Sequence, residues 1–121
     1  MTMRSTSTYS VGHVVVVEVP FSDGSGFKRR PALVVSTERF HRRLPDVIVC
    51  PVTSQPRSFK NPGTGDRPLR SWRSAGLRFP STARVAKILA VDKQLIGRVL
   101  GTVTGRDLAR VQRGLRTAFG L

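Results

Sequence analysis

The sequence is short of acidic residues, histidine, cysteine and long apolar runs. Among 121 residues there are 7 Asp and Glu, 2 His and 1 Cys, and aromatic residues make up 7%. The lone Cys50 excludes an internal disulfide and suits a reducing cytoplasm. No apolar run approaches the roughly 20 residues of a membrane-spanning helix. The polar N-terminus lacks the apolar centre of a secretory signal. We therefore expect a cytoplasmic protein with no membrane partner.

The shortage of acids and histidines also limits the chemistry. His13 and His41 lie far apart in the sequence, and no C-x-x-C, H-E-x-x-H or acidic cluster is present. A metal site would need ligands from scattered positions, and a two-metal nuclease centre is not expected. We predict no metal and no cofactor, and we interpret His13 as structural and His41 as solvated.

Positive charge is what the chain has in excess. Lys and Arg number 21, which gives a formal net charge of +14 and an isoelectric point near 11.9. Of these residues 17 are Arg and 4 are Lys. A GC-rich genome would explain the preference for Arg but not the shortage of acids. A charge of this size favours polyanionic partners, either nucleic acid or an acidic protein.

The length fits one domain. Residues 1–10 are polar and aperiodic, and we predict a flexible tail before a single domain at 11–121. Apolar, β-branched runs bounded by Gly and Pro predict strands at 14–19, 31–36, 46–53, 82–91 and 94–103. Between them we expect a loop at 21–30, a helical turn at 37–43, and a loop at 56–82 with a short strand near 77–79.

The C-terminal segment predicts an amphipathic helix. Thr104 can cap its N-terminus, and Asp107 places an acid in its first turn. Apolar residues recur on one face, and arginines on the other face are interpreted as solvated. The apolar positions are Leu108, Val111, Leu115 and Ala118, and the basic positions are Arg106, Arg110, Arg113 and Arg116. The expected fold class is mainly β with a C-terminal α-helix, in which the helix packs on a small antiparallel barrel.

Two segments carry the residues that point to a function. One is Lys28-Arg29-Arg30-Pro31 at the start of the second strand, and the other is Thr53-Ser54-Gln55 at the end of the third. Arg and hydroxyl groups suffice for phosphoryl transfer when the substrate brings its own nucleophile, as the 2′-hydroxyl of RNA does. The protein then orients the phosphate and stabilises the charge that develops on it.

These segments also carry a resemblance to a known family. The run G-H-V-V-V-V-E-V-P-F-S-D-G-S-G-F-K-R-R-P-A-L-V-V-S, followed by V-I-V-C-P-V-T-S-Q, resembles the MazF/PemK (Kid) toxins of type II toxin–antitoxin systems over residues 12–55. Weaker agreement follows at 72–81 and in L-G-T-V-T-G-R-D-L-A-R-V. The resemblance implies a small SH3-like (CcdB/MazF-type) barrel that forms a homodimer.

The resemblance also implies an activity, namely metal-independent, sequence-specific cleavage of single-stranded RNA, with mRNA as the expected target. The products carry 2′,3′-cyclic phosphate and 5′-hydroxyl ends. The Arg and Thr that act in the family correspond to Arg30 and Thr53. Because a guanidinium stays protonated at ordinary pH and is therefore a poor general base, we expect Arg30 to act mainly by stabilising charge.

The neighbours of Arg30 and Thr53 are the candidates for RNA binding. They are Phe21, Lys28, Arg29, Ser54 and Gln55. Gln55 could read a base edge or close a turn, and Phe21 could stack on a base or pack back onto the domain. At Gly24-Ser25-Gly26-Phe27 the chain departs from the usual family sequence, which leaves the cleaved RNA motif open.

Two other functions stay open, as does the identity of a neutralising partner. A non-enzymatic toxin of the same fold would inhibit DNA gyrase through the C-terminal Phe119-Gly120-Leu121, and a third possibility is a catalytically silent nucleic-acid-binding barrel. Arg30 and Thr53 favour the ribonuclease because gyrase binding does not need them. The expected partner is an acidic, partly disordered antitoxin segment that orders over the loops around both residues.

Overall fold

The computed structural model describes residues 9–21 and 23–121. The first eight residues of the predicted flexible tail lie outside the described residues. Its last two residues belong to the fold, contrary to the prediction. Tyr9 is buried, and its carbonyl oxygen accepts a hydrogen bond from the His41 ring. The Ser10 N–H donates to Nδ1 of His13 at 3.1 Å. The ordered domain therefore includes Tyr9.

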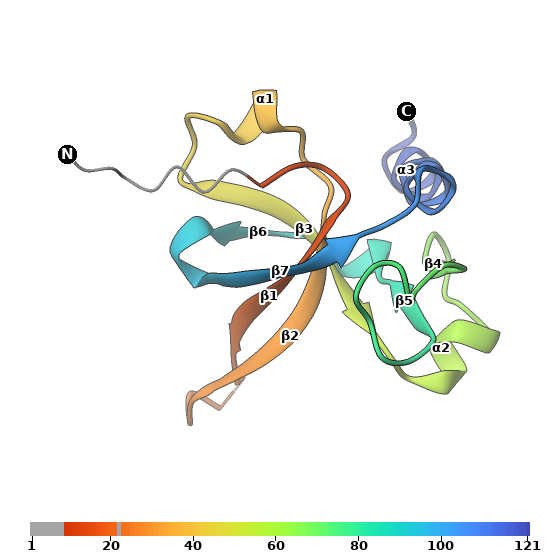
Figure 1. Cartoon of the computed structure of the whole chain (residues 1–121), viewed down its shortest axis with the longest axis horizontal. Coiled ribbons are helices and arrows are strands. Elements are labelled where there is room, and N and C mark those ends of the chain that lie inside the picture. Colours follow the sequence, from red (N-terminus) through yellow and green to blue (C-terminus); the bar gives the residue numbers. More distant parts are fainter. Residues whose placement is uncertain (1–8, 22) are drawn as a thin grey trace.

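The described part of the chain forms a curled, seven-stranded antiparallel sheet (Figure 1). β1 pairs with β2 on one side and with β7 on the other, while β3 pairs with β2. The free side of β3 pairs first with β6 and then with β5, which also pairs with β4. The bounds are β1 His13–Pro20, β2 Phe27–Val34, β3 Asp46–Thr53, β4 Arg67–Leu69, β5 Ser81–Ala83, β6 Leu89–Asp92 and β7 Ile96–Thr102. This topology confirms the predicted small, SH3-like barrel.

Both faces of the central strands are buried, which explains their unbroken apolar runs. Side chains alternate between the two faces of a strand. Val15, Val17 and Ala32 contribute to one core cluster, inside the barrel. Val14 and Leu33, on the other face, contribute to a second cluster that also includes residues of the C-terminal helix.

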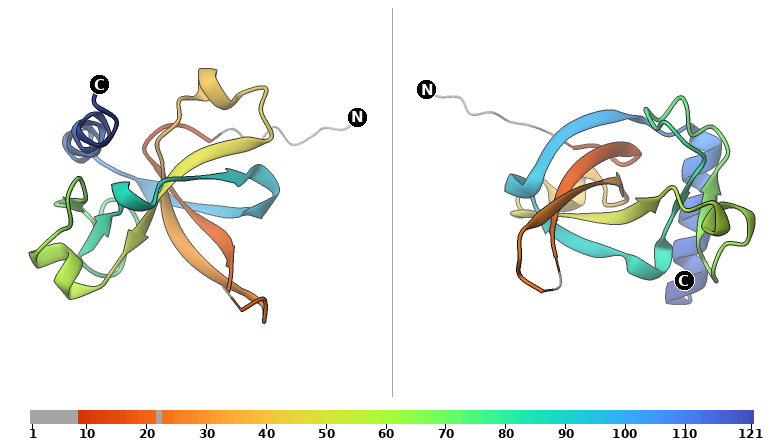
Figure 2. Two further views of the ribbon diagram at one scale, coloured as in Figure 1. Left: turned by 180° about the vertical axis from the view of Figure 1, so that it is seen from behind. Right: turned by 90° about the horizontal axis from the view of Figure 1, so that it is seen from below.

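The helices are α1 Glu38–His41, α2 Pro56–Lys60 and α3 Gly105–Phe119, with 3-10 turns at Val85–Lys87 and Lys93–Leu95. As predicted, α3 is capped by Thr104, whose side chain accepts from the Asp107 N–H. Figure 2 shows α3 beside β4 and β5 at one side of the barrel. Val111 is fully buried, but Ala118, expected on the apolar face, is exposed. No helix among the described residues is long and apolar enough to span a membrane.

Several element boundaries differ from the prediction. β2 begins at Phe27, inside the predicted loop, because residues 27–30 continue the ladder with β1. The predicted strand at 82–91 is interrupted by a 3-10 turn, and residues 56–82 contain α2 and β4 but no strand at 77–79. The structure also corrects the interpretation of His41. Its ring is 2% exposed, and Nδ1 lies 2.7 Å from the Ser36 hydroxyl.

Asp107 has a larger role than an acid in the first helical turn. Its carboxylate is 1% exposed and accepts the backbone N–H groups of Arg70 at 3.0 Å and Ser71 at 2.8 Å. It also forms an ion pair with Arg110 at 2.6 Å. Arg110 is therefore not one of the unpaired, solvated arginines expected on that face of the helix. Asp107 thus fastens the segment after β4 to the start of α3.

We expect Asp107→Ala to lower the free energy of unfolding by about 3 kcal/mol, because two backbone donors and a guanidinium lose their acceptor. Urea denaturation measures the change. Asp92→Ala is the matched control, since the exposed Asp92 accepts one backbone N–H, from Gln94 at 2.8 Å. Its expected cost is about 1 kcal/mol. Equal losses in the two variants would contradict the role assigned to Asp107.

Candidate RNA-binding groove

A groove opens where β2 separates from β3. The last paired residues of the two strands are Ala32 and Pro51, and beyond them β3 continues to pair with β5 on its opposite edge. The resulting hollow has a volume of about 1150 Å³. We call it the central groove, and its lining comes from β1, β2, the β3–α2 junction, the segment before β5, and β7 with the turn before it.

Arg30 and Thr53 both line the central groove. Arg30 and Thr53 each lie two positions beyond the last β2–β3 pair, Ala32 and Pro51, where the two strands have separated. Arg30 is exposed, and its guanidinium makes no hydrogen bond or ion pair with the described residues. Both predicted catalytic residues therefore line the same groove, and the Arg30 guanidinium is available to an anionic ligand.

The hydroxyl of Thr53 is oriented by the turn that follows it. Its Oγ1 accepts the backbone N–H of Gln55 at 3.2 Å, which leaves the hydroxyl proton to donate elsewhere. Ser54 and Gln55 are exposed and line the central groove. Gln55 also precedes α2 as its N-cap residue, with no side-chain capping bond. Its backbone closes the turn, and its side-chain amide is not used for capping.

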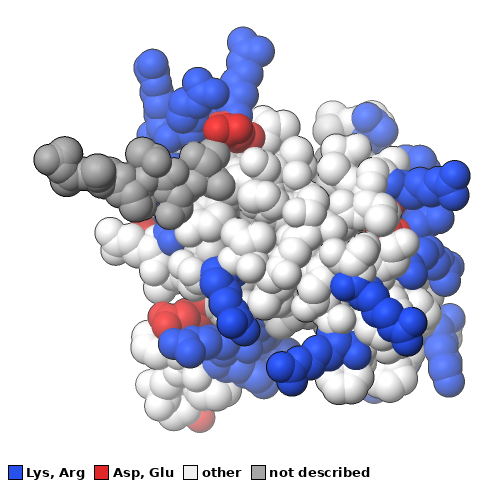
Figure 3. Space-filling model, in the orientation of Figure 1, with Lys and Arg blue, Asp and Glu red and all other residues white. Residues whose placement is uncertain are grey.

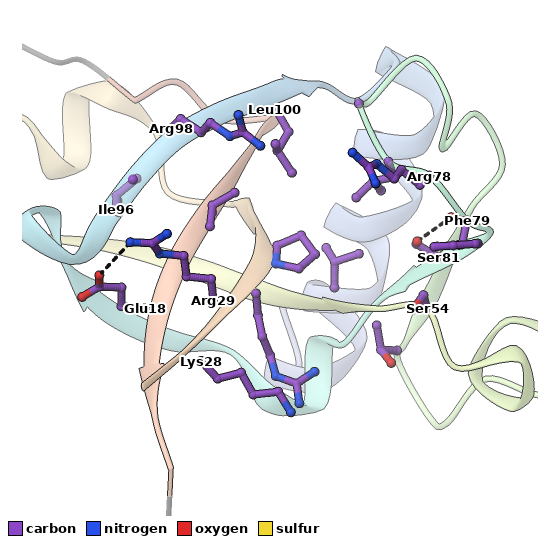
Figure 4. Close-up of a pocket in the computed structure, with 18 of the residues that line it drawn as sticks. Glu18, Lys28, Arg29, Ser54, Arg78, Phe79, Ser81, Ile96, Arg98 and Leu100 are labelled. Carbon is purple, nitrogen blue, oxygen red and sulfur yellow. Dashed lines mark hydrogen bonds and ion pairs between the residues drawn. The ribbon is translucent and has the colours of Figure 1, made fainter. Parts of the chain in front are cut away.

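The remaining predicted binding residues differ in position. Lys28 and Arg29 line the groove, and Arg29 lies 3.8 Å from the Glu18 carboxylate (Figure 4). This ion pair is exposed and adds little to stability. Phe21 is not part of the groove lining, and its ring lies 5.9 Å from the Lys28 ammonium. The geometry thus favours packing of Phe21 against its own hairpin.

Several groove residues were not predicted from the sequence. Figure 4 shows Arg98 on β7 and Arg78 and Phe79 before β5, around the same hollow as Arg29. The other lining residues that the sequence did not indicate include Glu18, Ser81 and Gln94. The arginine-rich composition of 56–82 was a signal for binding, but an aperiodic segment gives no indication of where each side chain points.

Arg78 and Phe79 reach the groove because the turn before them packs closely against the backbone of β7. Gly76 has a φ of +81°, and a Cβ at this position would collide with the Leu100 carbonyl oxygen. A Cβ on Gly101 would lie 2.6 Å from the Ala75 carbonyl carbon. Two glycines thus allow the turn at 72–76 to pack directly on β7, and the chain then continues along the groove.

Positive charge predominates among the ionisable residues that line the central groove. Figure 3 shows Lys and Arg side chains around the periphery of the face in view and acidic side chains at only a few positions. Glu18 is the one carboxylate among the residues that line the central groove. The electrostatic character of this surface suits a polyanion.

Cys50 does not contribute to the groove. Burial raises the pKa of the Cys50 thiol to about 12, with a further contribution from Asp66, so the thiol is protonated at neutral pH. It is fully buried and does not line the groove. Among the described residues, no three His, Cys, Asp or Glu side chains form a group that could hold a metal ion.

Solved structures show the same fold. The chain aligns with an endoribonuclease from mycobacterial species at 21% identity and a TM-score of 0.75, over 98% of this chain and 97% of the other. A second mycobacterial structure, an endoribonuclease in complex with its cognate antitoxin, gives 23% identity and 0.72 over 95% and 96%. A MazE–MazF complex from Deinococcus radiodurans gives 21% and 0.74 over 94% and 98%.

Comparison with curated protein sequences gives no match. A family model describing the PemK-like, MazF-like toxins of type II toxin–antitoxin systems matches residues 10–119. This match spans the barrel, α3 and every residue of the central groove. It agrees with the resemblance seen in residues 12–55 and extends it to nearly the whole chain. The chain belongs to the PemK-like, MazF-like family of type II toxin–antitoxin toxins.

Proposed function

We propose that this toxin is a sequence-specific endoribonuclease that cleaves single-stranded RNA, with mRNA as the expected target, in the central groove and without a metal ion. The observation that carries the proposal is that Arg30 and Thr53 both line one arginine-lined groove. Family membership and the endoribonuclease neighbours support it.

The proposed reaction uses the RNA's own 2′-hydroxyl as the nucleophile. Its oxygen bonds to the adjacent phosphorus while the bond from phosphorus to the 5′-oxygen breaks. The 2′-hydroxyl loses a proton and the 5′-oxygen gains one, which leaves a 2′,3′-cyclic phosphate and a 5′-hydroxyl. Negative charge grows on the phosphoryl oxygens during the transfer, and Arg30 is free to pair with them. The Thr53 hydroxyl donates a hydrogen bond to the same phosphate and fixes its position.

Cleavage is expected to be independent of divalent metal ions. The purified toxin should cut a defined single-stranded RNA at the same rate with EDTA as with added Mg²⁺, because Arg30 and Thr53 supply the phosphate contacts. Gel analysis of a 5′-labelled RNA measures the rate, and circular dichroism checks that the protein is folded. Loss of cleavage on chelation in folded protein would overturn this mechanism.

An acidic, partly disordered segment of an antitoxin is the proposed neutralising partner. An extended acidic peptide suits the same arginine-lined groove as an RNA strand and would inhibit by covering it. Exposed charge pairs are weak and screened by salt, so apolar contacts should supply most of the affinity while charge accelerates association.

Association and dissociation rates, measured by surface plasmon resonance across a salt series, test whether apolar contacts supply the affinity while charge accelerates association. We expect the association rate constant to fall several-fold between 50 and 500 mM salt, while the dissociation rate constant changes little. A dissociation rate that rises steeply with salt, while the association rate stays constant, would contradict these roles of charge and apolar contacts. A structure with the partner bound away from the central groove would contradict inhibition by occlusion.

Gyrase inhibition stays an alternative because the C-terminal end is accessible. Phe119 is 58% exposed and Leu121 is 88% exposed, and neither lines the central groove. Gyrase inhibition would leave both Arg30 and Thr53 without a role. A catalytically silent nucleic-acid-binding barrel would leave Thr53 without one. The homodimer implied by the family resemblance also stays a prediction.

A further inference from the structure

A second hollow adjoins the central groove. It lies between α2 and the segment before β5 and has a volume of about 340 Å³. We call it the apolar cup, and it is lined by Ser54, Pro56, Phe59, Lys60, Phe79 and Pro80. Ser54, Pro56 and Phe79 line the central groove as well. Because Ser54 directly follows Thr53, a ligand held at Thr53 has the cup beside it.

The cup is apolar but presents an aromatic ring to solvent. Phe79 is 61% exposed, while Phe59 is half-buried. Two prolines and two phenylalanines form most of the lining, and polar groups come only from Ser54 and Lys60. Flat apolar surfaces with a few polar atoms at the rim suit a planar heterocycle, which stacks by its face and hydrogen-bonds by its edge.

The backbone around the cup is constrained before any ligand binds. Pro56 starts α2, and Pro80 follows Phe79 directly. The Ser81 hydroxyl donates to the Phe79 carbonyl oxygen at 2.7 Å, and Ser81 itself is buried (Figure 4). A backbone constrained in this way loses little conformational entropy when a ligand binds.

The charge around the cup fits a ligand that carries phosphates. The guanidinium carbon of Arg70 lies 5.8 Å from the centre of the Phe59 ring, and Arg78 lines the central groove next to Phe79. No acidic residue lines the cup. A nucleotide offers both a base for the cup and phosphates for the surrounding arginines.

We propose that the apolar cup binds one unpaired nucleobase next to the scissile phosphate, stacked on Phe79. This inference rests on the proposed ribonuclease function and adds a base-binding site to the pair Arg30 and Thr53. Phe79 does not contact the reacting atoms and acts by fixing the register of the RNA strand, so that one particular phosphate reaches Thr53.

Binding of an uncleavable RNA tests the inference separately from catalysis. The probe is a fluorescent, fully 2′-O-methylated oligonucleotide that spans a site cleaved by the wild-type protein, and anisotropy measures its dissociation constant. Phe79→Ala should weaken binding roughly 5- to 150-fold, the effect of losing one base–aromatic stack. Phe79→Trp, which keeps an aromatic face, should bind within a few-fold of wild type. Phe40→Ala is the matched control on α1, since Phe40 is 55% exposed and lines neither hollow.

A series of probes in which one nucleotide at a time is replaced by an abasic ribose locates the base. One position should lower wild-type affinity by about the factor lost in Phe79→Ala, and the same replacement should leave binding by Phe79→Ala nearly unchanged. If the loss of affinity caused by the abasic nucleotide added to the loss caused by Phe79→Ala at every position, the inference would be overturned. Unchanged RNA binding by Phe79→Ala would also overturn it and would assign the cup to another ligand, such as an apolar side chain of a protein partner. If wild-type protein cleaves no RNA, the proposed function fails and this inference fails with it.

Discussion

Replacing Arg30 with alanine is expected to slow RNA cleavage roughly 10²–10³-fold and to leave the fold intact. Loss of one preorganised donor to a developing oxyanion has an effect of this size. Arg30 lines the central groove together with Thr53 and has no ion-pair partner among the described residues. Because its side chain is exposed, the substitution removes little packing. Single-turnover cleavage at saturating protein measures the rate of the chemical step.

Arg29→Ala is the matched control for Arg30→Ala. Arg29 is the adjacent residue on the same strand, lines the same groove and is already near a carboxylate, that of Glu18. It should lose less than 10-fold in the chemical step and mainly weaken RNA binding. Equal losses at the two positions would indicate general charge attraction instead of a positioned group. An Arg30→Ala protein that remains as toxic as wild type in cells would favour the gyrase alternative.

Replacing Thr53 with valine is expected to slow cleavage by a similar factor, roughly 10²–10³-fold. Valine keeps the shape and the β-branch of threonine but removes the hydroxyl. In the structure the Thr53 hydroxyl oxygen accepts a hydrogen bond from the Gln55 N–H at 3.2 Å. The hydroxyl can therefore donate a hydrogen bond to a phosphate oxygen. The same single-turnover assay measures the loss, and Thr53→Ala should match Thr53→Val.

Thr53→Ser restores the hydroxyl and should recover the rate to within about 10-fold of wild type. The thermal unfolding midpoint separates catalysis from stability, because the hydrogen bond to Gln55 is partly solvent-exposed and its loss should cost about 1 kcal/mol or less. A Thr53→Val protein that cleaves as fast as Thr53→Ser would show that the hydroxyl has no part in the reaction.

The strands around the site could be predicted because their sequences leave few alternatives. Runs such as Val14 to Val17 are apolar at every position, as expected for strands buried on both faces. The C-terminal helix was equally clear, with a capping Thr104 and regular apolar spacing. Arg30 and Thr53 were identified by the family resemblance, and their positions in β2 and β3 bring both into the lining of the central groove.

The rest of the groove depends on contacts between distant segments, which spacing alone does not reveal. Arg78 and Phe79 lie in an aperiodic stretch, and their position follows from the packing of Gly76 against Leu100. The burial of His41 depends on hydrogen bonds to Ser36 and to the Tyr9 carbonyl. Neither contact has a local signature in the sequence.

Identification of the nucleophile tests the central claim most directly. An RNA oligonucleotide that the toxin cleaves is compared with the same oligonucleotide carrying a single 2′-deoxynucleotide immediately 5′ of the cleaved phosphate, and mass spectrometry identifies the product ends. Attack by the 2′-hydroxyl predicts a 2′,3′-cyclic phosphate and a 5′-hydroxyl from the unmodified RNA, and no cleavage at that phosphate in the substituted one. Cleavage of the 2′-deoxy substrate, or a product with a 5′-phosphate, would show that water or a protein group is the nucleophile and would contradict the mechanism.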